Sequence, residues 1–144
     1  QFAVFGQKDY QQLAVIRALV NQLNFPIQIV GHPTARAQDG LALSSRNGYL
    51  TAEERAAAPL LYQTLQMLDA ALRAGQTDYR HLEKQAVQIL QQQDWQVDYI
   101  EIIDPISFDL LPDGVASEQV AILAAAKLGK TRLIDNIEVC ISKQ

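Results

Sequence analysis

The first 30 residues contain two short apolar runs separated by an amphipathic segment, and this pattern constrains the fold more than any other. The runs lie at residues 2–5 and 27–30 and are rich in residue types that favour strands. Between them, Leu13, Ile16 and Val20 recur at helical spacing, and Asp9 is placed to cap this helix. A strand, a helix and a strand within about 30 residues form a βαβ unit, so we expect two parallel strands with a right-handed crossover.

The run at residues 2–5 is apolar at every position, which is typical of a strand buried on both faces of a parallel sheet. The sequence also starts with glutamine rather than methionine. We therefore expect the chain to be the C-terminal part of a longer protein. The second strand is expected to end at Val30, before Gly31-His32-Pro33, and a loop with a sharp turn at Asp39-Gly40 follows.

The remaining residues predict two helices and three antiparallel strands. Thr51-Ala-Glu-Glu54 has the form of a capping box, and the helix after it should be kinked or divided at Pro59. A second helix is predicted from about residue 77, a strand over 95–103 and a short helical turn over 107–111. The alanine-rich run at 120–128 favours a helix by propensity, but Gly129-Lys130 favours a hairpin, which we adopt.

Composition narrows the class of protein. With 49% hydrophobic and 19% charged residues, the chain is expected to bury a core. No apolar run is long enough to span a bilayer and no leader-like segment opens the sequence, so we interpret the chain as soluble and cytoplasmic, without a membrane partner. Cys140, His32 and His81 form no metal-ligand pattern, so we expect no metal-ligating residues and a buried structural role for both histidines.

The charge distribution favours a small anionic ligand over a nucleic acid. The net charge is −4, which argues against binding to a polyanion. Residues 1–46 nevertheless contain four basic and two acidic residues, a net charge of +2, and the remainder contains eight basic and fourteen acidic residues, a net charge of −6.

Two polar segments follow the predicted parallel strands, at the edge where open α/β sheets bind ligands. The first is Gly6-Gln7-Lys8-Asp9-Tyr10-Gln11-Gln12, at a helix N-terminus, where an anion is favoured. The second is Asp39-Gly40-Leu41-Ala42-Leu43-Ser44-Ser45-Arg46-Asn47, whose hydroxyls and guanidinium suit a phosphate. Taken alone, each segment is also explained without a ligand, as a capped helix with a surface lysine or as a polar loop.

In combination these segments, together with Leu133-Ile134-Asp135-Asn136, resemble the pantoate–β-alanine ligase family of Rossmann-like nucleotidyltransferases. The similarity covers essentially all 144 residues but only the C-terminal half of the family's chain. The resemblance implies an α/β plus α+β fold class. Residues 1–33 would end a Rossmann-like parallel sheet, and residues 34–144 would form a lid-like α+β domain of two or three helices and a three-stranded antiparallel sheet, with a hinge at residues 34–39.

The resemblance also implies a binding site. It assigns ATP binding to Gly6, Gln7, Lys8, Asp9, Ala35, Leu43, Ser44, Ser45 and Arg46, and pantoate binding to Gln12. The adenine contact of Ala35 would be made by its backbone. The family more often has a larger apolar residue at this position, so the departure affects only a side-chain contact. The family's HxGH-type motif, which carries its catalytic histidine, is absent. No catalytic residue is therefore expected in this chain, which alone should be inactive.

The implied reaction uses ATP and Mg²⁺. The pantoate carboxylate attacks the α-phosphate to give pantoyl adenylate and pyrophosphate, and the amine of β-alanine then displaces AMP. The family is typically homodimeric. Two alternatives remain: a folded packing or assembly module that does not bind nucleotide, and a tRNA-binding protein by analogy with aminoacyl-tRNA synthetases, which the negative charge disfavours.

Overall fold

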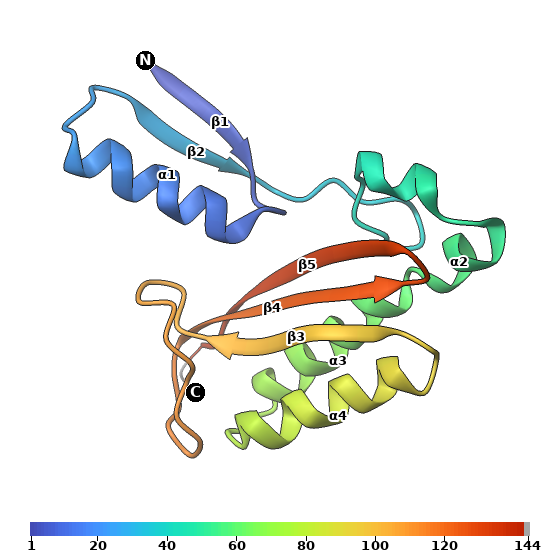
Figure 1. Ribbon diagram of the computed structural model, residues 1–144. Helices are drawn as coiled ribbons and strands as arrows, with labels where there is room; N and C mark the ends of the chain where they lie inside the picture. The colour runs from blue at the N-terminus through green and yellow to red at the C-terminus, as the bar shows by residue number, and fades with distance from the viewer. Residues whose placement is uncertain (143–144) are drawn as a thin grey trace.

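The computed structural model describes residues 1–142, which form two separate sheets (Figure 1). The smaller sheet pairs β1 (Phe2–Gly6) with β2 (Gln28–His32) in parallel, and α1 (Tyr10–Gln22) connects them. The larger sheet is antiparallel in the order β3 (Gln96–Ile103), β4 (Gln119–Leu128) and β5 (Thr131–Cys140). The predicted βαβ unit and the predicted three-stranded antiparallel sheet are both confirmed.

The βαβ unit departs from expectation in its burial. Pairing with β1 extends β2 two residues beyond the predicted end at Val30, as far as His32. Strand β1 was expected to be buried on both faces, but Phe2 and Val4 are 72% and 53% exposed, and Ala3 and Phe5 between them are only partly buried. In α1 only Leu13 is buried, and Val15 and Leu19 are exposed. The apolar pattern predicted these elements correctly, but much of their apolar surface faces solvent.

Three helices and a short 3-10 turn complete the fold: η1 (Ser45–Tyr49), α2 (Ala52–Ala57), α3 (Leu60–Arg73) and α4 (Tyr79–Gln91). The capping box is confirmed, since the Glu54 N–H donates to Thr51 Oγ1 at 3.1 Å and the Thr51 N–H donates to Glu54 Oε2 at 3.0 Å. Pro59 separates α2 from α3, as predicted for a residue that cannot donate the helical hydrogen bond.

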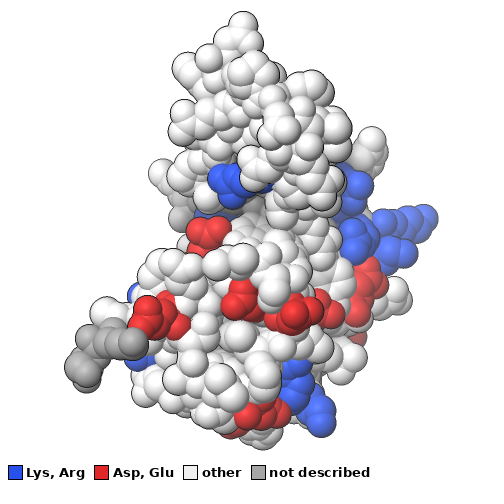
Figure 2. Space-filling view, turned by 90° about the vertical axis from the view of Figure 1, so that its left-hand side faces the viewer, with Lys and Arg blue, Asp and Glu red and all other residues white. Residues whose placement is uncertain are grey.

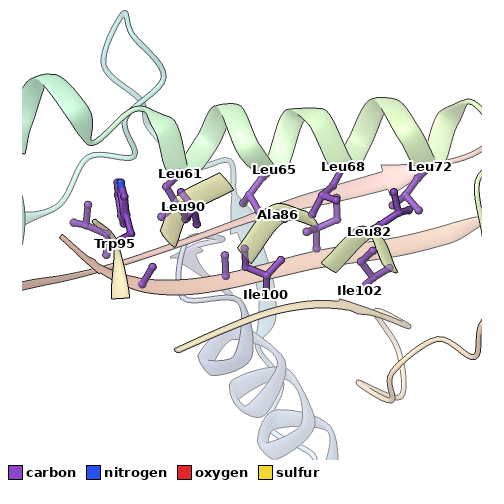
Figure 3. Packing of buried hydrophobic residues seen from close by; sticks show 14 of the residues in the cluster. Leu61, Leu65, Leu68, Leu72, Leu82, Ala86, Leu90, Trp95, Ile100 and Ile102 are labelled. Atoms are coloured by element: carbon purple, nitrogen blue, oxygen red, sulfur yellow. The ribbon is translucent and has the colours of Figure 1, made fainter. Parts of the chain in front are cut away.

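The main core lies between the helical layer and one face of the antiparallel sheet (Figure 3). One stripe of α3, formed by Leu61, Leu65, Leu68 and Leu72, packs with Leu82, Ala86 and Leu90 of α4 and with Ile100 and Ile102 of β3. A spacing of three and four residues places the four leucines on one side of α3. Burial of these side chains holds α3 and α4 on the sheet.

The alanine-rich run forms β4, so the predicted hairpin is confirmed. Its register with β5 runs from Gln119↔Cys140 to Leu128↔Thr131, and Gly129 turns the chain at a φ of +61°. Every residue from Val120 to Ala126 is buried, because β4 is the central strand and is covered on both faces. Small side chains fit this position, and tertiary burial therefore overrides the helix propensity of alanine.

The short helix predicted over residues 107–111 is wrong. Phe108 adopts a φ of +64°, and Leu110 forms an antiparallel bridge with Ile103. The Asp104 carboxylate accepts hydrogen bonds from the N–H groups of Ile106 and Ser107 at 2.7 and 3.0 Å. An aspartate-centred turn therefore replaces the helix, because the side chain satisfies the backbone donors locally.

The βαβ unit lies over the sheet face opposite α3 and α4 (Figure 1). A second, smaller cluster marks this contact, in which Tyr10 and Phe108 pack against Ile103, Ala121 and Leu123. The first turn of α1 thus meets β3 and β4. No helix within residues 1–142 is long and apolar enough to cross a membrane.

Candidate functional site

The loop between β1 and α1 is held at both ends. The Gln7 N–H donates to the His32 carbonyl at 2.8 Å, and α1 begins at Tyr10. Asp9 occupies the N-cap position, as predicted, but its side chain makes no capping hydrogen bond. Its carboxylate is exposed beside Lys8 and is available to a ligand.

A cavity of about 280 Å³ lies between this loop and the antiparallel sheet. One wall is formed by residues 8–12, and the other by Tyr99, Leu123, Arg132, Ile134, Asp135 and Asn136, among others. The cavity therefore brings together three of the predicted site residues, Lys8, Asp9 and Gln12. Gly6 and Gln7 precede it along the chain and lie outside its lining.

Of the two basic residues that line this cavity, Arg132 lies on β5 and Lys8 on the loop after β1. Partial burial lowers the pKa of the Lys8 ammonium group below the ordinary value of 10.5, although the carboxylates of Asp9 and Asp135 act in the opposite direction. Arg46 and Arg36 lower the pKa of Lys8 further. Lys8 therefore lies in the field of two further cations, and an anion bound at the cavity would offset their repulsion.

The second polar segment begins with a tight antiparallel turn. The Leu43 N–H donates to the Ala35 carbonyl at 2.8 Å, and the Ala37 N–H donates to the Leu41 carbonyl at 2.9 Å. Gly40 turns the chain at a φ of +94°, which confirms the predicted turn at Asp39-Gly40. Ala35 is exposed, and one hydrogen bond already occupies its carbonyl oxygen.

The residues predicted to bind phosphate follow this turn on the surface. Leu43 is 53% exposed, Ser45 and Arg46 are exposed, and Ser44 is partly buried. The Arg46 N–H donates to Ser44 Oγ at 3.1 Å, which starts η1. These four residues lie outside the lining of the cavity, although the charge of Arg46 reaches Lys8. They are not buried in a core, so their side chains remain accessible to a ligand.

Arg36 connects the turn that begins the second polar segment to β5. Its guanidinium donates to both carboxylate oxygens of Asp135, at 2.7 and 2.8 Å, and to the Gly40 carbonyl at 3.1 Å. It also lies over the Tyr62 ring, 3.7 Å from the centroid. The hinge predicted at residues 34–39 is therefore held against β5 from Arg36 onward. Sequence reasoning missed this arrangement, because Asp135 is one of three charged residues in β5 and nothing in the sequence marks it as the buried one.

Asn136, the next residue of β5, holds the first segment. Its side-chain nitrogen donates to the carbonyls of Gln7 and Lys8, at 2.8 and 3.0 Å. In the sequence, Asn136 belongs to a segment that carries the family resemblance, and no role was predicted for it. The two adjacent β5 residues thus connect the two polar segments.

The two histidines contribute neither to this site nor to a core. His32 is exposed at the end of β2, where Nδ1 hydrogen-bonds to the carbonyl of the adjacent Pro33 at 2.9 Å. His81 is exposed on α4. The expectation that both histidines are buried structural residues is therefore wrong, because each side chain points to solvent.

Figure 2 shows how charge is distributed on one side of the molecule. The upper part, formed by β1, α1 and β2, is almost entirely uncharged, since residues 1–34 contain only Lys8, Asp9 and Arg17 as charged residues. Basic side chains lie where this part meets the rest of the molecule, and acidic side chains lie below them. Positive charge is therefore found at the junction that contains the cavity.

Comparison with known proteins gives one consistent answer. The sequence model of the family described as pantoate-beta-alanine ligase matches residues 1–138. Pantothenate synthetase from Pseudomonas aeruginosa (strain UCBPP-PA14) is 57% identical over 137 residues, which cover 95% of this chain and 48% of that protein. The chain therefore spans about half the length of the curated relatives that it matches.

Solved structures agree with the sequence comparison. The crystal structure of pantothenate synthetase from Thermus thermophilus is 40% identical and has a TM-score of 0.88, covering 97% of this chain and 50% of that one. Pantoate-beta-alanine ligase from Francisella tularensis, complexed with beta-gamma ATP and beta-alanine, is 28% identical and has a TM-score of 0.61. The match covers 94% of this chain and 42% of that one.

Proposed function

The chain belongs to the pantoate-beta-alanine ligase family, and on this basis we propose that it forms part of the ATP site of an enzyme that joins pantoate to β-alanine. The observation that carries the proposal is the cavity shared by Lys8, Asp9 and Gln12, with the charge of Arg46 acting on Lys8. The Francisella tularensis relative, which is complexed with beta-gamma ATP and beta-alanine, supports the same ligand class.

The arrangement of the two sheets supports a division of the chain into two domains with different roles. Residues 1–33 would end a Rossmann-like nucleotide-binding domain of the nucleotidyltransferase type, and residues 34–144 would form the lid-like domain over the nucleotide. Support for this division comes from the separate hydrogen-bonding of the two sheets and from the cavity between them. Ligands of open α/β sheets bind beyond the carboxyl ends of the strands, where Gly6 and the loop after it lie.

In the proposed first step, a pantoate carboxylate oxygen bonds to the α-phosphorus of ATP, and the bond from this phosphorus to the bridging oxygen breaks. Pyrophosphate leaves with the electron pair. Negative charge grows on the phosphate oxygens, so the reaction needs positioned cations and donors rather than a protein nucleophile. Lys8 and Arg46 supply the cations, and Ser44 and Ser45 supply hydroxyl donors.

The remaining residues position the substrates. Gln12 lines the cavity from the first turn of α1 and would contact pantoate, and Asp9 and Gly6 would lie near the ribose. The backbone of Ala35 would contact the adenine, and the exposed Leu43 would begin the segment of residues 43–46 that lies along the phosphates. In the second step the β-alanine nitrogen bonds to the acyl carbon and loses a proton, the bond from this carbon to the AMP oxygen breaks, and AMP leaves with the bonding electrons. None of these residues is assigned a covalent role.

The described residues do not fit a protein-held Mg²⁺ site. No group of three or more His, Cys, Asp or Glu side chains within residues 1–142 is arranged to hold a metal ion. Of the two carboxylates at the cavity, Asp135 is engaged by both guanidinium nitrogens of Arg36. Charge stabilisation by this chain is therefore assigned to Lys8 and Arg46.

Calorimetric titration with ATP tests the proposal, both on the 144-residue chain and on the full protein. We expect the full protein to bind ATP, and Lys8→Ala and Arg46→Ala each to weaken binding at least tenfold, since each removes a hydrogen bond between charged groups worth roughly 1.5–3 kcal/mol. Lys84→Ala on α4 is the control, because Lys84 lies in the helical layer on the far side of the sheet. Absence of ATP binding by the folded full protein would leave only a packing or assembly role.

An activity assay tests the division of the enzyme. The 144-residue chain alone is expected to form no pantothenate from ATP, pantoate and β-alanine, because it contains no HxGH-type motif. Pantothenate formation by this chain would show that the catalytic residues lie within it and would contradict the proposed assignment.

A further inference from the structure

Two adjacent residues of β5 bind the two polar segments from opposite faces of the sheet. Asp135 pairs with Ala124 and Asn136 with Leu123, and these two β4 residues belong to the clusters on opposite faces. Successive side chains of a strand point to opposite faces, so Asp135 and Asn136 diverge. The Asp135 carboxylate holds Arg36, and the Asn136 amide holds the loop after β1. A single strand therefore fixes the positions of both segments.

The Asn136 side chain uses both of its donor hydrogens on consecutive carbonyls. Nδ2 lies 2.8 Å from the Gln7 oxygen and 3.0 Å from the Lys8 oxygen, and the residue is only 7% exposed. These two carbonyls belong to the peptide groups on either side of the Lys8 Cα atom. Their fixation therefore sets the backbone conformation from which the Lys8 side chain projects into the cavity.

The same two hydrogen bonds orient two backbone donors. In a trans peptide group the N–H points opposite to the C=O, so the N–H groups of Lys8 and Asp9 point away from Asn136. Within residues 1–142, neither of these N–H groups donates to a backbone carbonyl. Both donors lie immediately before the N-terminus of α1, on the loop that carries Lys8.

We propose that Asn136 is a positioning residue of the ATP site, which presents the Lys8 side chain and the N–H groups of Lys8 and Asp9 to a nucleotide phosphate. The inference rests on the proposed function, because it assigns Asn136 to the site where ATP binds. Asn136 touches the protein loop and acts on the ligand only through it. Asp135 has the corresponding role for the second segment, which it holds through Arg36.

A space-filling role would not require an amide at this position. An apolar side chain could fill the same volume, but it would leave the partly buried carbonyls of Gln7 and Lys8 without donors. Asn136→Asp keeps the shape and removes both donor hydrogens, whereas Asn136→Ala removes the side chain. The donor role predicts that the aspartate variant is impaired at least as strongly as the alanine variant. The space-filling role predicts the reverse order.

Hydrogen–deuterium exchange of the segment containing residues 6–12, measured on the full protein without nucleotide, tests the contact itself. Both variants should raise exchange in this segment by about tenfold, because two hydrogen bonds of ordinary strength are lost. Exchange in α3 should not change. Arg73→Ala is the control, because Arg73 donates to the Cys140 carbonyl at the other end of β5. Unchanged exchange of residues 6–12 in both variants would overturn the proposal.

Titration with ATP tests the consequence for the site. We expect the affinity for ATP to fall about tenfold in both variants, and the KM for ATP to rise more than the KM for β-alanine, because the loss of two ordinary hydrogen bonds displaces Lys8. If the unsubstituted full protein binds no ATP, the proposed function fails, and the role of Asn136 fails with it. If the unsubstituted protein binds ATP and both variants bind it with unchanged affinity, only the positioning role fails. A milder effect of Asn136→Asp than of Asn136→Ala would also overturn the role.

Discussion

Arg36 and Asp135 are 99 positions apart in the sequence and form a two-pronged ion pair, with Nη1–Oδ2 and Nη2–Oδ1 distances of 2.7 and 2.8 Å. The Asp135 side chain is 2% exposed and the Arg36 side chain 18%. Burial alone would lower the pKa of the Arg36 guanidinium, but the hydrogen bonds and the charge of Asp135 outweigh it, so the pKa is raised. The pair joins the second polar segment to β5.

Asp135→Ala should destabilise the protein strongly, because it leaves a largely buried guanidinium without its counter-charge. We expect the free energy of unfolding, measured in urea, to fall by about 3 kcal/mol. The double variant with Arg36→Met and Asp135→Leu should lose less, since it leaves no unpaired charge. Arg55→Ala is the control, because the Arg55–Asp39 pair has the same 2.7 Å distance but is exposed to water. A loss for Asp135→Ala as small as that for Arg55→Ala would contradict the assigned role.

ATP binding should weaken as pH rises through the lowered pKa of Lys8. Partial burial places this pKa below 10.5 in the free protein, and a bound phosphate would raise it by favouring the ammonium form. Affinity is therefore full while Lys8 is protonated in the free protein, and it falls as the pH rises through the free-protein pKa. Calorimetric titrations from neutral to alkaline pH measure this fall.

Lys8→Arg supplies the matched control for this pH dependence. Arginine keeps a positive charge and remains protonated throughout the alkaline range. Its ATP affinity should therefore change less with pH than that of the unsubstituted protein. Parallel pH profiles for the two proteins would show that Lys8 does not titrate in the ATP site.

The elements that the sequence predicted correctly each depend on a local pattern. The Thr51–Glu54 capping box, the break at Pro59 and the hairpin at Gly129 all follow from residues close together in the chain. The short helix predicted over residues 107–111 was wrong, because Asp104 satisfies the backbone donors of a competing turn. A local pattern predicts the wrong element where the same residues can satisfy their backbone hydrogen bonds in two different local conformations.

The contacts that organise the candidate site could not be predicted in this way. Asn136 and Gln7 are 129 positions apart, and no periodicity in the sequence connects them. Similarly, apolar alternation predicted β1 and α1 but not the exposure of Phe2 or Val15, because a pattern identifies an apolar face without showing what covers it. Only the placement of the βαβ unit over β5 brings Lys8 to Asn136.

Glu83→Gln should reduce the fall in the free energy of unfolding that occurs as the pH rises from acidic to neutral. Burial raises the pKa of the Glu83 carboxyl above 4.5, although the Ile102 N–H at 2.8 Å and Arg80 at 2.9 Å oppose this shift. A carboxyl with a raised pKa in the folded state contributes stability below the unfolded pKa, and this contribution is lost as pH rises through the folded pKa. Urea unfolding should therefore show that stability falls less between acidic and neutral pH in Glu83→Gln than in the unsubstituted protein.

Glu83→Ala separates this effect from the loss of a hydrogen bond. The glutamine carbonyl can still accept from the Ile102 N–H, whereas alanine leaves this donor of β3 unpaired. The alanine variant should be less stable than the glutamine variant at every pH. A stability profile of Glu83→Gln that runs parallel to that of the unsubstituted protein would contradict the raised pKa.

Gly40→Ala should lower the free energy of unfolding more than Gly75→Ala, although both positions require nearly the same backbone conformation. Their φ angles are +94° and +93°, so an alanine at either site carries a strain of roughly 1–2 kcal/mol. At Gly75 an added Cβ meets nothing within 4 Å, but at Gly40 it would lie 2.6 Å from Tyr62 Cδ1. Tyr62 is held by the Arg36 guanidinium over its ring, so it cannot move away without weakening that contact.

We expect Gly40→Ala to lower the free energy of unfolding by about 1–3 kcal/mol more than Gly75→Ala does, measured by urea unfolding of the two variants. Equal losses of stability would show that the Tyr62 ring can move aside, and that the turn at Gly40 is not packed against the Arg36–Tyr62 contact.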